Sequence, residues 1–83
     1  KVGNEKVARD WANRALDADR NEPAVAYNVA CVFTMLGDNE TALDLLEKAV
    51  DMGFGYKVWL INDPSLKPLQ DEPRLKALLE RLN

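Results

Sequence analysis

The stretch of residues 26–53 constrains the fold more than any other part of the chain, because its apolar residues repeat with the period of a helix on both sides of Gly37. The spacing i, i+3, i+4, i+7 predicts a helix that ends near Leu36 and a second helix of about Glu40 to Met52, capped by Asp38 or Asn39. Stripes rich in alanine let two antiparallel helices approach to about 8–10 Å. The two stripes are Ala26, Val29, Ala30 and Phe33, and Ala42, Leu45, Leu46 and Ala49. These residues predict a helical hairpin.

The hairpin is part of an internal repeat. When the sequence is compared with itself after a shift of 34 positions, five identities fall within residues 3–20, where roughly one is expected from average usage. A period of 34 residues is typical of the tetratricopeptide repeat. We therefore expect the chain to begin inside a repeat, with a first helix of about Glu5 to Ala18 capped by Asn4, and to be a piece of a longer protein. The identical pairs are Gly3 and Gly37, Ala8 and Ala42, Asp10 and Asp44, Ala15 and Ala49, and Asp17 and Asp51.

The hairpin resembles a tetratricopeptide repeat (TPR), whose pattern is W-x2-L-G-x2-Y, then A-x3-F, then A and P. The chain departs from this pattern at Ala26 and Phe54, and in the preceding half-repeat at Ala12 and Arg20. The resemblance implies an all-α, TPR-like helix-turn-helix solenoid fragment of about five helices in an antiparallel right-handed superhelical stack. The segments that match are Val29-Ala30-x2-Phe33 and Ala42-x3-Leu46-x2-Ala49.

The last third of the chain, residues 54–83, departs from the repeat. A helix that begins near Lys57 is expected to stop by Asn62, because the residue before Pro64 is pushed out of the α region. One capped turn should follow, and then a helix with leucines at i, i+3, i+4 and i+7 that cover the second helix of the hairpin. These leucines are Leu75, Leu78, Leu79 and Leu82.

This segment resembles the end of TPR arrays in bacterial signalling proteins, some with an adenylate-cyclase or Ser/Thr-kinase domain upstream. The resemblance implies a terminal cap. We therefore interpret the chain as a single TPR-like domain, in which residues 1–20 are the second helix of a truncated repeat, residues 21–53 are a complete repeat and residues 54–83 are an irregular cap.

Composition argues against several classes of function. The net charge is −3 and the basic residues are scattered, so we expect no nucleic-acid binding. The uncharged run from Pro23 to Gly37 is too short to span a bilayer, which needs about 20 apolar residues. A single cysteine, Cys31, favours a reducing, cytoplasmic location.

Residues suited to catalysis or metal binding are scarce. The chain has no histidine, and Cys31 lies in an apolar helix where packing is its expected role, so we expect no enzyme and no cofactor. The run Asp17-x-Asp19-x-Asn21 imitates a calcium loop, but Glu22 and Asn28 stand where Gly and Glu are required. We expect the aromatic residues to form core rather than a set that stacks on a ligand; these are Trp11, Phe54, Tyr56 and Trp59.

The expected function is to bind a partner protein or peptide. In a TPR array the first helices line the concave surface, and the helix from Pro23 would direct one face there. Asn28 lies where related domains hold the terminal carboxylate of a peptide, although its presence there is also part of the family pattern. The candidate peptide-binding residues are Tyr27, Asn28, Cys31, Thr34 and Met35, with Ala24 beside them.

The alternative is a structural cap that packs on an upstream catalytic domain and binds no ligand. A binding groove should leave Tyr27, Thr34 and Met35 exposed, whereas a cap should leave the face around Trp11 or the last helix uncovered. The first helix also carries Val7 and Leu16 in addition to Trp11, and without a covering helix it is expected to make the fragment form a homodimer.

Overall fold

Every regular element in the described part of the chain is a helix, as expected for an all-α fold. The computed structural model describes the backbone of residues 2–18 and 21–82 and the side chains from residue 5 onward. Asp19 of the run that imitates a calcium loop, and Arg20, where the half-repeat departs from the TPR pattern, lie outside the described residues. The elements are α1 (Val2–Ala18), α2 (Pro23–Met35), α3 (Asn39–Asp51), α4 (Lys57–Asn62), the 3-10 helix η1 (Pro64–Leu69) and α5 (Pro73–Arg81).

The helix boundaries follow local chemistry. Proline begins α2, η1 and α5, where its missing N–H has no intrahelical partner to lose. The carboxylate of Asp38 accepts a hydrogen bond from the Thr41 N–H at 3.2 Å, so Asp38 rather than Asn39 caps α3. The predicted cap at Asn4 is wrong, because α1 begins at Val2 and the flexible Gly3 does not interrupt it.

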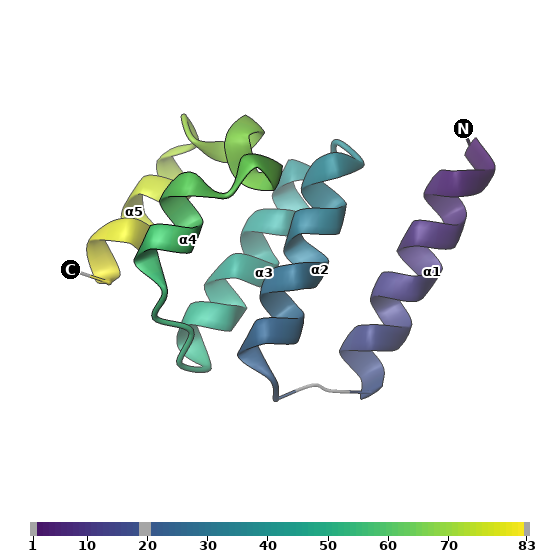
Figure 1. The fold of residues 1–83 in the computed structure, drawn as a ribbon, viewed down its shortest axis with the longest axis horizontal. Coiled ribbons are helices and arrows are strands. Elements are labelled where there is room, and N and C mark those ends of the chain that lie inside the picture. Colours follow the sequence, from purple (N-terminus) through teal and green to yellow (C-terminus); the bar gives the residue numbers. More distant parts are fainter. Residues whose placement is uncertain (1, 19–20, 83) are drawn as a thin grey trace.

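The predicted hairpin is formed by α2 and α3, which lie side by side (Figure 1). Gly37 turns the chain between them with φ 85°, a conformation that a residue with a side chain rarely adopts. The apolar stripes on both helices are buried, and α1 packs on α2 through the fully buried Ala12. An ion pair of 3.2 Å between Arg9 and Asp38 adds a contact between α1 and the start of α3.

The last three elements fold back on the hairpin. α4 ends at Asn62, as predicted, and η1 forms the expected turn with Asp63 as its N-cap. Three leucines from this segment, Leu60, Leu66 and Leu69, are fully buried, and η1 contacts α2. The segment therefore contributes to the core of the hairpin rather than only to its end.

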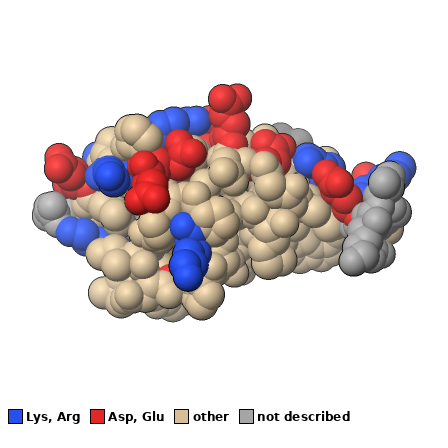
Figure 2. All heavy atoms as spheres, turned by 90° about the horizontal axis from the view of Figure 1, so that it is seen from above, with Lys and Arg blue, Asp and Glu red and all other residues tan. Residues whose placement is uncertain are grey.

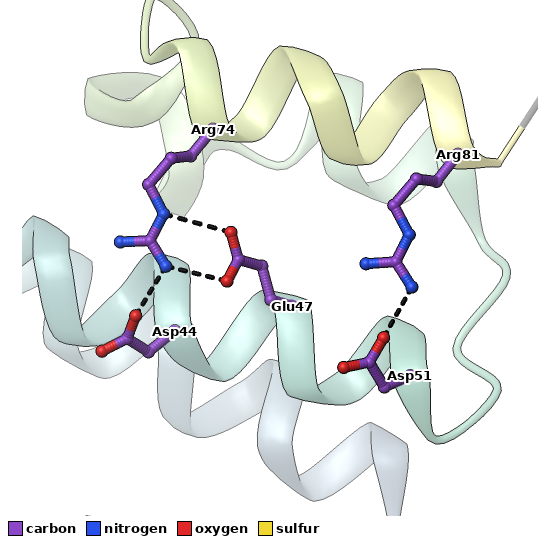
Figure 3. A network of polar contacts seen from close by, with 5 residues as sticks. All are labelled: Asp44, Glu47, Asp51, Arg74 and Arg81. Carbon is purple, nitrogen blue, oxygen red and sulfur yellow. Dashed lines mark hydrogen bonds and ion pairs between the residues drawn. The ribbon is translucent and has the colours of Figure 1, made fainter.

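α5 lies along α3, as the leucine spacing predicts. Leu75 and Leu78 are buried, and Leu79 and Leu82 pack at the edge of the core. Figure 3 shows the polar contacts that flank this packing. Arg74 donates to both carboxylate oxygens of Glu47 at 3.1 and 2.9 Å and also contacts Asp44, and Arg81 contacts Asp51.

Candidate functional site

Two of the candidate binding residues are buried. Tyr27 and Thr34 each expose only 3% of their surface, so the prediction that both are exposed is wrong. The reason is that the segment after Gly53 folds over this face of α2: the ring of Tyr27 stacks on that of Phe54 at 4.7 Å and lies 5.9 Å from that of Trp59. The Thr34 hydroxyl donates to the Ala30 carbonyl within α2 at 2.9 Å.

A polar contact joins α2 to the residue between α4 and η1. The Tyr27 hydroxyl donates to the carboxylate of Asp63, and so does the Cys31 thiol at 3.8 Å. The backbone N–H of Ser65 donates to the other carboxylate oxygen at 2.9 Å. The hydrogen bond from Tyr27 is the largest cause that lowers the pKa of Asp63, while burial and the bond to Asp63 raise the pKa of Tyr27. Asp63 is therefore ionised at neutral pH and Tyr27 is a neutral donor.

Cys31 is half-buried, and it is expected to react slowly with iodoacetamide. Burial, followed by the negative charge of Asp63, raises the pKa of the thiol to about 11. Only the thiolate reacts, so about one thiol in a thousand is reactive at about pH 8. Labelling followed by mass spectrometry should be much slower in the folded chain than in denaturant, and Asp63→Asn should accelerate it. Equal labelling rates in the folded and the unfolded chain would contradict the raised pKa of the Cys31 thiol.

The remaining candidates on α2 are exposed. Met35 exposes 70% of its surface, and Asn28 is exposed as well. α2 carries no charged residue from Pro23 to Met35. The role of these residues in peptide binding stays a prediction.

A group of exposed apolar residues that was not predicted surrounds α4. We name it the α4 patch: Tyr56, Val58, Trp59 and Ile61, which expose 61%, 65%, 52% and 45% of their surfaces. Four aromatic residues were expected in the core, and of these Phe54 is buried in it. The expectation is wrong for Trp11, Tyr56 and Trp59, which are exposed. Tyr56 and Trp59 stack on each other at 5.0 Å instead. The sequence did contain a signal for this exposure. Successive residues of a helix point about 100° apart, so the run of four apolar residues from Val58 cannot share one buried face.

An open depression adjoins the α4 patch. Its volume is about 340 Å³, and it is lined by Val58, Trp59, Asn62, Asp63 and Pro64. Val58 and Asn62 lie one helical turn apart and share a face of α4. The depression therefore combines an apolar wall with the carboxyl residue that also contacts α2.

α1 presents a second, smaller apolar surface. Val7 and Trp11 expose 68% and 52% of their surfaces, as expected for a helix that lacks a covering neighbour. Leu16 was expected to share this exposure, but it packs against the core. The predicted homodimer through this surface stays a prediction.

Within the described residues there is no group of three or more Cys, Asp or Glu side chains placed to hold a metal ion. In the same part of the chain, no helix has the length and apolar character needed to cross a membrane. No protein-family model matches the chain, and comparisons with curated proteins and with solved structures return no match.

Proposed function

We propose that the chain is a TPR-like protein-interaction module that binds a partner peptide or domain through the α4 patch and the exposed residues of α2. The observation that carries this proposal is the exposure of the α4 patch. It holds four of the seven large hydrophobic residues that are exposed in the described part of the chain. Tyr56 stacks on Trp59, and Val58 and Trp59 line one depression, so these three side chains adjoin one another. Contiguous exposed apolar surface is typical of interaction sites, and aromatic side chains and Met are enriched at their centres.

The position of α4 supports the same proposal. α2 and α4 lie nearer the viewer than α3 and α5 in Figure 1, as first helices that line the inner surface of a TPR array would. Figure 2 shows the molecule from above, so that this side forms the lower edge of the view. That edge is mostly uncharged, although one basic group lies above it to the left of the centre, and most charged side chains lie along the upper edge and at both ends. An uncharged surface avoids the cost of desolvating charges when a partner binds.

The second candidate function is docking on another domain through α1. The exposure of Val7 and Trp11 favours it, and of the three residues that a groove on α2 was expected to expose, only Met35 is exposed. The two candidates use different helices, so they predict different effects of the same substitution on α1 and on α4.

Selection from a random peptide library tests the proposal. Peptides enriched on the native chain are expected to lose binding to the double variant Val58→Ser and Ile61→Ser by about 10-fold or more, because two exposed apolar contacts of about 1 kcal/mol each are removed. Val7→Ser is the matched control, since Val7 and Val58 are exposed to similar extents, 68% and 65%.

The control should bind the selected peptides as the native chain does. Peptides that are lost on Val7→Ser and kept on the double variant would favour docking through α1. A selection that enriches no peptide would contradict the proposed function.

A further inference from the structure

The depression beside α4 combines apolar surface with a negative charge. Among the residues that line it, only Asp63 carries a charge. Val58 and Trp59 are more than half exposed, so their apolar surface is accessible to a ligand. A ligand that fits this site needs an apolar part and a part that complements a carboxylate.

The groups that donate to Asp63 leave its negative charge in place. Among the described residues these donors include the Tyr27 hydroxyl, the Cys31 thiol and the Ser65 backbone N–H, which are neutral. These bonds hold the carboxylate in one position at the junction of α4 and η1, where the residue is half-buried. A half-buried charge with neutral partners attracts a cation more strongly than a fully hydrated one, because water screens it less.

Long basic side chains suit both parts of the site. Lysine and arginine lay their methylene stems along apolar surface and keep the charged head at a polar group. Indole is also the best aromatic partner for a cation. We propose that this depression binds a lysine or arginine side chain of a partner peptide, with the stem on Val58 and Trp59 and the head at Asp63; this assignment rests on the proposed function and names the chemistry of its ligand.

The test is an NMR titration with two short peptides whose ends are blocked. One carries arginine between two leucines, and the other carries norleucine in its place, which keeps an apolar stem and removes the charge. The indole N–H signals of Trp59 and Trp11 are followed. Trp11 is the internal control, because it is exposed to the same extent as Trp59, 52%, on a different helix.

The arginine peptide is expected to shift the Trp59 signal and leave that of Trp11 in place. It should bind about fivefold more tightly than the norleucine peptide at low ionic strength, as expected for a partly exposed ion pair. The difference should shrink as salt is raised to about 0.5 M, because salt screens the exposed charges.

Asp63→Asn is the matched variant. Asparagine keeps a side-chain oxygen for the Ser65 N–H and is as good an N-cap as aspartate, so η1 can keep its start while the charge is lost. The preference for arginine should vanish in this variant, with the norleucine peptide bound as before. In Val58→Ser, which keeps the carboxylate, both peptides should bind more weakly and the preference should remain.

The failures of the two proposals are distinguishable. Equal binding of the two peptides by the native chain, or a preference for arginine that survives Asp63→Asn, would overturn the proposal that the depression binds a basic side chain. Neither result would contradict the proposed interaction function. If neither peptide moves the Trp59 signal and library selection also enriches nothing, both proposals fail.

Discussion

Replacing Tyr27 by alanine is expected to lower the free energy of unfolding by about 3–5 kcal/mol, the usual cost of truncating a large buried aromatic residue. Tyr27 exposes 3% of its surface and stacks on Phe54, and its hydroxyl donates to Asp63. A large fraction of a small domain's margin of about 5–15 kcal/mol is therefore lost. Denaturant unfolding followed by circular dichroism measures the change.

The variant Tyr27→Phe distinguishes the contribution of the hydroxyl to stability from that of the ring. It keeps the stack on Phe54 and should cost only about 1–2 kcal/mol, the scale of a partly exposed hydrogen bond to a charged group. Because the pKa of Asp63 is lowered in the folded chain, its stabilisation is present above about pH 4 and is lost as the pH falls below that value. Tyr27→Phe should weaken this acid dependence. A Tyr27→Ala variant with native stability would show that Tyr27 is not part of the core.

Deleting residues 73–83 is expected to unfold the chain at room temperature. The deletion removes the fully buried Leu75 and Leu78 and uncovers the face of α3 on which they pack. Burial of a leucine stabilises a fold by about 1.5–3 kcal/mol, so the two together are comparable to the margin of a small domain. Loss of the helical circular dichroism signal and of a cooperative melt would be the observed result.

Arg74→Gln is the control for this deletion. It breaks the ion pairs with Glu47 and Asp44 but keeps α5 and its leucines. Contacts between partly exposed charges contribute little, so its melting temperature should stay close to that of the native chain. A truncated chain that melts at the native temperature would mean that α5 is dispensable. If Arg74→Gln lost the cooperative melt, the ion pairs rather than the leucines would be what keeps α5 packed on α3.

The hairpin and the packing of α5 were predictable because their signals are local. Alanines and leucines at helical spacing identify the faces of α2, α3 and α5, and Gly37 marks the turn. The burial of Tyr27 was not predictable in this way, because it depends on the distant segment after Gly53, whose Phe54 and Trp59 rings pack against the Tyr27 ring. Helical spacing groups Tyr27 with Met35, yet the covering segment reaches only the first of them.

The exposure of the α4 patch depends on the length of α4. A helix of six residues offers little surface to the core, so Leu60 is buried and its neighbours Val58, Trp59 and Ile61 remain outside. Residue type alone favours burial for all four. The path of the chain after Asp63 decides which of them is covered, and no local pattern specifies that path.

We propose that partners bind on α4 and not on α1 or on the buried face of α2. The most direct test is an amide chemical-shift map of the chain with a peptide selected from the library. We expect the largest shifts on residues 57–63, smaller shifts at Asn28 and Met35, and none at Val7 and Trp11. Shifts centred on Val7 and Trp11 would contradict it.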